Sequence, residues 1–600
     1  MHNLRTLQDL VKTFKNIETL PFISWKESGL VKRLSYGEGL ETINAYSRGF
    51  LEIGLKPQDK IAIFSSNIPL WIILTLAINN AALIDVPRGH DSEAEEINYI
   101  LEHSKAKIAI VENQALLDKL RKYRHKHLEL VLSIEMLPGV RHISQIEQVG
   151  RNSKKLLPRV EREQTASIIY TSGSTGIPKG VELMHFNFIS NAVSALNRIK
   201  IKQEDKFISI LPAWHAFERV VKYAAIVGGA ETFYTSQKAL LEDMLSENPS
   251  VMASVPRIWE RVYDGVMKKV KEQSGLKRAV FNLLLKTSIE SHKKKHAAHP
   301  LKVAGKITTG MLDKIVFNEL RAKLGKKFRL GVSGGSKLPD YIDDFFNVAR
   351  IELIEGYGLT ETSPAIAVRV IGSKALYTVG PALEGVKIRI TDSETGKETK
   401  QGIEGIIYVK GPNVMKGYYR NFEETKKILD NNGWLDTGDI GYLDKHNNLV
   451  ISGREKDIVV LSNGENVNPV PLETALSRSE YISSVMVTGH DWKFLGALIV
   501  PNPDTLRVFC EKNNIRWNEN NFQEALNDTK VTELFSREIK KYVNNKTGFK
   551  NIELIREFRF LTQPFEVGKE LTATLKLRRN KVIEIYKKHI ESMRKSIHDG

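Results

Sequence analysis

Residues 170–181 read Tyr-Thr-Ser-Gly-Ser-Thr-Gly-Ile-Pro-Lys-Gly-Val, directly after the apolar run 166–170, which predicts a buried strand. Glycine lets a backbone approach a ligand closely, and N–H groups and hydroxyls in such a loop can surround phosphate oxygens. Lys179 adds a mobile positive charge. The Walker spacing is absent because Pro178 precedes this lysine and Gly180 follows it. We therefore predict a nucleotide-phosphate loop of another type, with an exposed Gly/Ser linker as the alternative.

The overall composition is that of a globular protein, with 42% hydrophobic and 26% charged residues. Its 600 residues exceed one ordinary core and suggest two to four domains. The single cysteine, Cys510, excludes an internal disulfide framework and a cysteine-rich metal site. The first residues lack the apolar core of a signal peptide, and the apolar run 68–78 is about half the ~20 residues that span a bilayer. We therefore expect a cytoplasmic protein.

The charge balance is strongly basic, with 88 Lys and Arg residues against 71 Asp and Glu residues. Such a balance favours anionic partners: nucleic acid, anionic lipid, or a polyphosphate such as ATP or coenzyme A. Composition alone does not choose among these partners.

Short apolar runs alternate with helical patterns over the first two thirds of the chain. The strand candidates are 61–64, 108–111, 207–211, 251–255 and 329–332, and a helix candidate covers 70–79. This alternation predicts an α/β domain of mostly parallel sheets covered by helices. Ligands of such sheets sit beyond the carboxyl ends of the strands, where the loop after Tyr170 would lie.

The pattern of predicted strands and helices changes twice in the last third of the chain. Short strands at 386–390, 405–409 and 449–452 predict a small β-rich subdomain. A separate, smaller α/β unit begins at about residue 455, with strands at 485–487 and 497–500 and helices at 532–544 and 581–595. We expect two domains, residues 1–455 and a mobile C-terminal domain of residues 456–600.

The region 268–326 is helical in pattern and rich in lysine. It has an apolar set of Leu276, Val280, Phe281, Leu284 and Leu285, followed by the basic cluster 292–296. A basic amphipathic helix can lie on an anionic membrane surface. The alternative is a solvated helix packed on the main domain.

Six further stretches carry polar or aromatic groups, in four of them beside glycines: residues 211–219, 333–338, 355–362, 433–441, 452–458 and 571–579. In the third of these, the ring of Tyr357 offers adenine a stacking face. Glu361 offers a hard oxygen ligand for Mg²⁺, and Thr360 can hydrogen-bond a phosphate oxygen. Taken singly, the other stretches could be turns, packed residues or solvated faces.

Together with the loop at 170–181, these stretches resemble in order those of the adenylate-forming superfamily of acyl-CoA synthetases, luciferases and adenylation domains. The resemblance covers residues 170–580 and extends more loosely to the N-terminal part. The segment 255–261, Val-Pro-Arg-Ile-Trp-Glu-Arg, and the lysine-rich region after it most resemble bacterial long-chain fatty acyl-CoA synthetases.

The resemblance implies specific roles for the matching residues. Catalytic roles fall to Lys576, Lys179, Glu361 and His215. Nucleotide and coenzyme A contacts fall to Thr171, Ser172, Gly173, Ser174, Thr175, Gly176, Gly334, Gly335, Tyr357, Gly358, Thr360, Asp439, Arg454 and Gly464. The acyl site is assigned to Phe217, Gly228, Gly229 and Trp259, the Mg²⁺ site to Glu361 and Thr171, and the hinge to Lys456.

Two departures from the family pattern stand out. Ala573 replaces the usual proline of the C-terminal lysine loop, and Ser336-Lys337 stands where small apolar residues are common. Lys569, in a Gly-Lys pair, remains an alternative to Lys576 as the catalytic lysine.

The implied activity joins a long-chain fatty acid to coenzyme A in two steps, with ATP and Mg²⁺. Attack of the carboxylate on ATP gives acyl-adenylate and pyrophosphate, and coenzyme A then takes the acyl group. An acyl-carrier-protein synthetase or acyl-AMP ligase is the alternative within the enzyme class, and a basic RNA- or membrane-binding scaffold is the alternative outside it. We expect no nucleic-acid partner, and a cytoplasmic protein for which contact with the inner face of an anionic membrane stays open.

Overall fold

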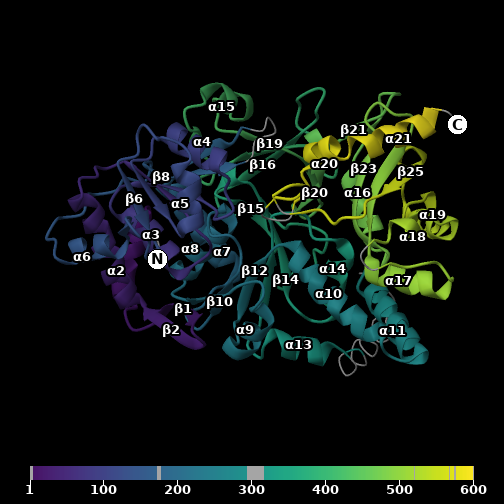
Figure 1. The fold of residues 1–600 in the computed structure, drawn as a ribbon, viewed down its shortest axis with the longest axis horizontal. Coiled ribbons are helices and arrows are strands. Elements are labelled where there is room, and N and C mark those ends of the chain that lie inside the picture. The colour runs from purple at the N-terminus through teal and green to yellow at the C-terminus, as the bar shows by residue number, and fades with distance from the viewer. Residues whose placement is uncertain are drawn as a thin grey trace. The chain divides into compact units, whose positions relative to one another are not determined.

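The computed structural model describes residues 4–171, 177–293, 312, 316–518, 521–566, 568–572 and 576–598. The chain forms two compact units, whose elements are labelled in Figure 1. Unit 1 comprises Met1–Arg389, Tyr408–Thr437 and Lys445–Leu449. Unit 2 comprises Ile390–Ile407, Gly438–Asp444 and Val450–Gly600.

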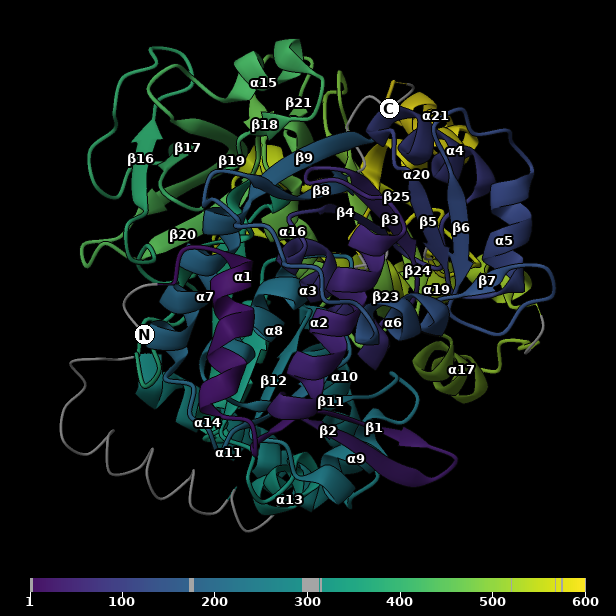
Figure 2. The same cartoon turned by 90° about the vertical axis from the view of Figure 1, so that its left-hand side faces the viewer.

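The first of the two large sheets in unit 1 has the order β18-β9-β8-β4-β3-β5-β6-β7. Its strands are β3 (Lys60–Phe64), β4 (Ile84–Arg88), β5 (Ile108–Val111), β6 (Leu130–Ser133), β7 (Arg141–His142), β8 (Thr165–Thr171), β9 (Lys179–Met184) and β18 (Gly417–Tyr418). Strands β3 to β8 pair in parallel, and Figure 2 shows β4, β3, β5 and β6 side by side. The edge is antiparallel, because β9 pairs with β8 and with β18.

The second sheet of unit 1 has the order β15-β14-β13-β12-β10-β11-β1-β2. Its strands are β1 (Pro21–Glu27), β2 (Leu30–Ser35), β10 (Lys206–Ser209), β11 (Glu231–Tyr234), β12 (Val251–Ser254), β13 (Leu330–Ser333), β14 (Leu353–Gly358) and β15 (Ala365–Val368). Pairing is parallel from β14 to β1 and antiparallel at both edges. The predicted α/β architecture of helix-covered, mostly parallel sheets is therefore confirmed.

Helices fill the space between the two sheets and cover their outer faces. Helix α3 (Pro69–Asn80) contacts both β4 and β1, and α7 (His185–Ile199) contacts both β9 and β15. The neighbours of this inner layer are α1 (Leu7–Lys12), α2 (Tyr36–Glu52), α6 (Ser144–Arg151) and α8 (Ala216–Val227). The outer helices are α4 (Ala94–Ser104), α5 (Gln114–Arg121), α9 (Leu240–Glu247), α10 (Pro256–Lys271), α11 (Gly275–Lys293), α13 (Asn318–Leu324) and α14 (Asp340–Val348).

Helix α3 shows why the apolar run near residue 70 is a core element. Pro69 begins it, where a fixed φ and a missing N–H cost nothing. Every residue from Trp71 to Asn80 is buried, because sheets lie on both sides of the helix. Among the helices that the structure describes, none is long and apolar enough to cross a membrane.

Helix α11 belongs to the lysine-rich region, and its apolar set is divided. Phe281 and Leu284 are buried, and α11 packs against α10 and α14. Leu276 and Val280 are exposed. The helix is therefore packed on unit 1, as the second of the two sequence interpretations expects. Residues 294–296 of the basic cluster lie outside the described residues.

A four-stranded sheet has the order β16-β17-β19-β20, with β16 (Lys387–Thr391), β17 (Gly405–Lys410), β19 (Leu435–Leu443) and β20 (Leu449–Arg454). Unit 2 holds the sheet β23-β24-β25 and the short pair β21–β22. These strands are β21 (Val459–Val460), β22 (Asn466–Val467), β23 (Ile482–Thr488), β24 (Leu495–Pro501) and β25 (Ile555–Phe560). The helices are α16 (Pro469–Leu476), α17 (Pro503–Lys512), α18 (Gln523–Leu526), α19 (Thr529–Tyr542), α20 (Arg579–Ile585) and α21 (Lys587–His598).

The predicted helix 581–595 is two helices in the structure. Helix α20 ends before Tyr586, and α21 begins after it. At the break, the Tyr586 hydroxyl donates to Glu570 Oε1 at 3.2 Å. This tertiary contact is invisible in the local sequence, which contains neither glycine nor proline there.

Candidate active site

The predicted phosphate loop joins two antiparallel strands, β8 and β9. Thr171, the last residue of β8, lies opposite Lys179, the first residue of β9. The Thr171 hydroxyl donates a hydrogen bond to the Lys179 carbonyl oxygen, at a distance of 3.5 Å. Ser172, Gly173, Ser174, Thr175 and Gly176 lie outside the described residues. The hairpin therefore holds the two described ends of the loop next to each other.

The Lys179 ammonium group lies among side chains from a distant part of the chain. Its Nζ forms an ion pair with Glu424 of α15 (Phe422–Ile428) and lies 5.0 Å from the centroid of the Tyr418 ring. Tyr418 reaches this place because β18 pairs with β9, opposite Val181. Hydrogen bonds from Lys179 and then Lys427 lower the pKa of Glu424 to about 2. Glu424 is therefore a carboxylate at neutral pH.

Glu361 contacts the hydroxyl group of the same tyrosine. It belongs to the short 3-10 turn Thr360–Thr362, and its Oε1 accepts a hydrogen bond from the Tyr418 hydroxyl at 2.9 Å. The turn is held close to the strand before it, because a Cβ at Gly358 would lie 1.8 Å from the Pro364 carbonyl oxygen. The structure thus brings Lys179 and Glu361 together around Tyr418, with the predicted Tyr357 on the strand that leads to the turn.

The acidic groups fit one mode of Mg²⁺ binding. Among the described residues, no group of three or more His, Cys, Asp or Glu side chains could hold a metal ion. Mg²⁺ is commonly bound by one or two carboxylates together with substrate phosphates. A single carboxylate, Glu361, half-buried near a lysine, matches this mode and not a cage made of protein alone.

His215 and Phe217 lie at the start of α8, in a turn closed by the His215 N–H, which donates to the Pro212 carbonyl at 3.1 Å. The neighbouring Trp214 is buried against Gly89, where a Cβ would lie 2.4 Å from the indole. The Phe217 ring covers the glycine turn after β13, because a Cβ at Gly334 would lie 3.0 Å from the Phe217 Cζ. The structure therefore joins the predicted acyl-site phenylalanine to the turn of Gly334 and Gly335, two of the residues predicted to contact the nucleotide or coenzyme A.

Three of the predicted acyl-site residues do not come to Phe217 in the described contacts. Gly228 and Gly229 follow the far end of α8, which at 1.5 Å per residue is about 18 Å long. A Cβ at Gly228 would lie 2.5 Å from Ile201 Cγ2. Trp259 is fully buried, packed on Gly331 and 5.4 Å from the Phe346 ring. A role for these three residues at the acyl chain stays a prediction.

Helix α8 also carries buried charges to which the sequence analysis gave no role. Arg219 donates to both oxygens of Asp85 at 2.6 and 2.7 Å and to the Ser167 hydroxyl at 2.7 Å, and neither member of the ion pair is exposed. One turn further, burial lowers the pKa of Lys222 to about 8, against the opposing effect of Glu218. These contacts fasten α8 to β4 and β8, the strand that enters the phosphate loop.

Glu355 is a second buried group that sequence reasoning missed. Its Oε1 accepts the Leu338 N–H at 2.8 Å, and its Oε2 lies 3.5 Å from Arg369. Burial raises the pKa of Glu355 to about 7, although the Arg369 guanidinium opposes this shift. The carboxyl therefore supports the end of the 333–338 loop. Its position in a strand, just before Gly356-Tyr357, carries no motif that would reveal this contact.

Unit 2 brings together two of the residues predicted to contact the nucleotide or coenzyme A. Asp439 in β19 is buried, and its Oδ1 accepts the Arg454 Nε–H across 2.8 Å. Lys456 follows in an exposed 3-10 turn, Glu455–Asp457. Gly464 has a φ of 83° in the turn between β21 and β22, a conformation that favours glycine, and a Cβ there would meet no atom within 4 Å.

Lys576 stands at one end of a small closed loop in unit 2. The Thr572 N–H donates to the Lys576 carbonyl at 2.8 Å, and the Lys576 N–H donates to the Thr572 hydroxyl at 3.0 Å. Residues 573–575, with Ala573 among them, lie outside the described residues. The alternative, Lys569, is exposed and forms an ion pair with Glu566 at 2.6 Å. The base of the loop is anchored by Arg579, which donates to Glu473 at 2.5 Å.

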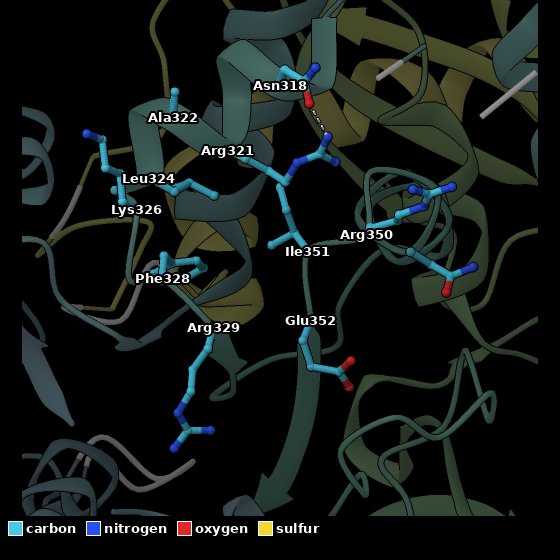
Figure 3. Close-up of a pocket in the computed structure, with 12 residues that line it drawn as sticks. Asn318, Arg321, Ala322, Leu324, Lys326, Phe328, Arg329, Arg350, Ile351 and Glu352 are labelled. Carbon is cyan, nitrogen blue, oxygen red and sulfur yellow. Dashed lines mark hydrogen bonds between the residues drawn. The ribbon is translucent and has the colours of Figure 1, made fainter. Parts of the chain in front are cut away.

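A hollow of about 650 Å³ in unit 1 contains none of the predicted site residues (Figure 3). It lies beside α13 and the residues that precede β13 and β14, whereas the predicted glycine turn follows the end of β13. Two of its arginines have protein acceptors. Arg329 binds Asp205 at 2.5 and 2.8 Å, and Arg321 donates to the Ala349 carbonyl at 2.6 Å. The hollow is therefore separate from the candidate site.

Comparisons with known proteins agree with this arrangement. A family model described as "AMP-binding enzyme" matches residues 15–419, and a model described as "AMP-binding enzyme C-terminal domain" matches residues 456–598. Among curated proteins, the chain is 30% identical to long-chain-fatty-acid–CoA ligase 5 of Rattus norvegicus. That match covers 95% of this chain and 85% of the relative.

Two further similarities bear on function and on fold. The chain is 29% identical to the chloroplastic long-chain-fatty-acid–[acyl-carrier-protein] ligase AEE15 of Arabidopsis thaliana, over 94% of this chain and 82% of that protein. It also matches the crystal structure of ATP-bound MatB from Rhodopseudomonas palustris with a TM-score of 0.71 at 21% identity, covering 97% and 99% of the two chains. At that identity, the second similarity shows the fold alone.

Proposed function

Because the chain belongs to the family of AMP-binding enzymes, we propose that it is a long-chain fatty acid:coenzyme A ligase that forms AMP. It activates a fatty acid with Mg-ATP to an acyl-adenylate and pyrophosphate, and then transfers the acyl group to coenzyme A. The long-chain assignment is supported by the similarity to the rat ligase.

One observation carries the proposal most directly. The Lys179 ammonium nitrogen lies 5.0 Å from the centroid of the Tyr418 ring. The Tyr418 hydroxyl donates a hydrogen bond to Glu361 at 2.9 Å. A cation for phosphate oxygens and a carboxylate for Mg²⁺ therefore both lie next to one side chain. A nucleoside triphosphate with its metal ion requires such a pair, a cation for its phosphates and a carboxylate for the metal ion.

In the first step, the fatty acid carboxylate attacks the α-phosphorus of ATP and pyrophosphate leaves. The chain contributes mainly positioning and charge stabilisation. Lys179 and Thr175 hold the outer phosphates, Tyr357 and Gly334 receive the adenine, and Asp439 and Arg454 receive the ribose hydroxyls. Glu361 and Thr171 would hold Mg²⁺, and the ion would supply positive charge to neutralise the phosphates. Lys576 meets the carboxylate, and His215 and Phe217 border the acyl chain.

In the second step, the thiol of coenzyme A attacks the acyl-adenylate and AMP leaves. We assign residues 1–455 to an adenylation domain and residues 456–600 to a mobile domain that turns about Lys456. The turn removes Lys576 and presents Gly464 to the pantetheine arm. One lysine cannot serve both steps if the thiol must enter from its side, which is the chemical reason for a movable domain.

A second candidate differs only in the acceptor of the acyl group. The Arabidopsis relative is named as an acyl-carrier-protein ligase, and its identity to this chain is within one percentage point of that of the rat ligase. The test is to supply ATP, Mg²⁺ and a panel of fatty acids, with either coenzyme A or phosphopantetheine-loaded carrier protein as acceptor. Thioester on coenzyme A supports the first candidate, and thioester on the carrier protein alone overturns it.

A further inference from the structure

The phosphate-loop lysine already has an anionic partner in the chain. Lys179 Nζ pairs with the Glu424 carboxylate, although 245 residues separate the two along the sequence. The pair is within unit 1, where β18 and α15 follow each other directly. A nucleotide phosphate that binds Lys179 must therefore take it from Glu424.

We propose that Glu424 is a positioning residue that competes with ATP for Lys179 and thereby sets nucleotide affinity. The inference rests on the proposed function, in which Lys179 holds the outer phosphates of ATP. Glu424 touches neither substrate nor metal in this account and acts through the lysine alone.

The surroundings of the pair allow the exchange. The side chain of Glu424 is 25% exposed and that of Lys179 is 17% exposed, so neither is sealed in the core. Helix α15 has no buried residue, and Glu424 keeps a second ion-pair partner, the 67% exposed Lys427, when Lys179 leaves. Breaking the pair with Lys179 therefore does not leave Glu424 as an isolated charge. An isolated charge is what usually makes the breaking of an ion pair costly.

Tyr418 keeps the lysine in place during the exchange. The ring lies 5.0 Å from Lys179 Nζ, and its hydroxyl is fixed by Glu361 at 2.9 Å. The ammonium group therefore has one neighbour that stays and one anion that phosphate oxygens replace. Glu424 lowers the affinity for the incoming phosphate by the strength of the pair that is broken.

The test is equilibrium binding of ATP, measured by calorimetry without fatty acid or acceptor. Glu424→Gln keeps the size of the side chain and removes its charge. We expect its Kd for ATP to be about two- to fivefold lower than that of the wild-type chain, the range of a partly exposed ion pair. The matched control is Glu423→Gln, an exposed residue of the same helix turn. It changes the net charge equally and should leave the Kd unchanged.

A double-mutant cycle separates this effect from general electrostatics. In a Lys179→Met background the lysine is absent, so Glu424→Gln should no longer change the affinity for ATP. Thermal unfolding of each variant verifies that the fold is retained.

The outcomes distinguish this inference from the proposed function. If the wild-type chain does not bind ATP, the proposed function fails and this inference fails with it. If the wild-type chain binds ATP but Glu424→Gln binds it equally or more weakly, or if the gain persists without Lys179, the inference about Glu424 alone is overturned.

Discussion

At the scale of single residues, Tyr418 is the side chain around which the candidate site of unit 1 is arranged. It contacts Lys179 with its ring and Glu361 with its hydroxyl. Both partners lie in stretches that sequence reasoning singled out. Tyr418 and Glu424 do not, because neither belongs to a glycine-rich turn or a recognisable motif. Their roles arise only when β18 pairs with β9, a contact between segments more than 230 residues apart.

Lys576 carries the prediction that separates the two chemical steps. An ammonium group between the carboxylate and the α-phosphate stabilises charge that builds up only during adenylation. We expect Lys576→Ala to lower adenylate formation at least ~100-fold, the typical effect of removing one such group. It should spare thioester formation from synthetic acyl-AMP.

The control for this prediction is Lys569→Ala. In the wild-type chain Lys569 is exposed and forms an ion pair with Glu566. Pyrophosphate release and acyl-coenzyme A formation are measured separately for both variants. Equal loss of the two half-reactions in Lys576→Ala, or a larger effect of Lys569→Ala, would refute the assignment.

Glu355 carries a pH prediction. Its pKa is about 7 in the folded chain against an ordinary value of 4.5, so the stability that its neutral form provides is complete below pH 4.5 and is lost as the pH rises through 7. The difference corresponds to about 3 kcal/mol. Glu355→Gln keeps an acceptor for the Leu338 N–H but never ionises. Between pH 5 and pH 8, the wild-type chain should lose up to about 3 kcal/mol relative to this variant.

Urea unfolding of both proteins at several pH values measures this difference. Other titrating groups contribute equally to the two profiles and cancel. If the free energies of unfolding of the two proteins changed in parallel with pH, the raised pKa of Glu355 would be refuted.

At the scale of elements, the alternation of short apolar runs and helical patterns was sufficient to predict helix-covered, mostly parallel sheets and the buried helix α3. An uninterrupted apolar run is a local property of the sequence, and β3, β5 and α3 each contain one. The antiparallel hairpin β8–β9 was not predicted as such, because β9 carries Lys179 and Glu182 among its apolar residues. The division of the last helix at Tyr586 has no local signal either.

Helix α8 depends on a buried ion pair that no sequence pattern reveals. Arg219 binds Asp85 at 2.6 Å, and neither side chain is exposed. We expect Arg219→Ala to lower the free energy of unfolding by about 3–5 kcal/mol, because Asp85 is left as an unpaired buried charge.

The matched control is Arg151→Ala, which breaks the half-exposed pair with Glu147 (2.7 Å) and should cost less than about 1 kcal/mol. Denaturant midpoints of the two variants provide the comparison. A smaller loss for Arg219→Ala than for Arg151→Ala would contradict the role given to this contact.

At the scale of the whole molecule, the order of the motifs indicated the family, which the matches over residues 15–419 and 456–598 confirm. The sequence could not supply the acceptor or the acyl chain length. One methylene group changes the binding free energy by only ~1 kcal/mol, and the pocket wall comes from residues far apart in the chain. Trp259 was assigned to the acyl site and is packed on Gly331 in the core, and its role at the acyl chain stays a prediction.

Lys456 carries the prediction about domain motion. Proline fixes φ near −65° and removes the N–H, so Lys456→Pro should prevent the residue from absorbing a large backbone rotation. We expect thioester formation from acyl-AMP to fall more than adenylate formation. The two half-reactions are timed separately by quenched flow. Unchanged thioester kinetics would remove the hinge proposal.

The central claim is that this chain couples a fatty acid to ATP through a mixed anhydride before any thiol is involved. The most direct measurement is pyrophosphate release by the purified protein with ATP, Mg²⁺ and a long-chain fatty acid, in the absence of coenzyme A. We expect release that requires the fatty acid, leaves acyl-adenylate on the protein, and is lost in Lys576→Ala. Absence of both pyrophosphate and AMP with every fatty acid, even after coenzyme A is added, would contradict it.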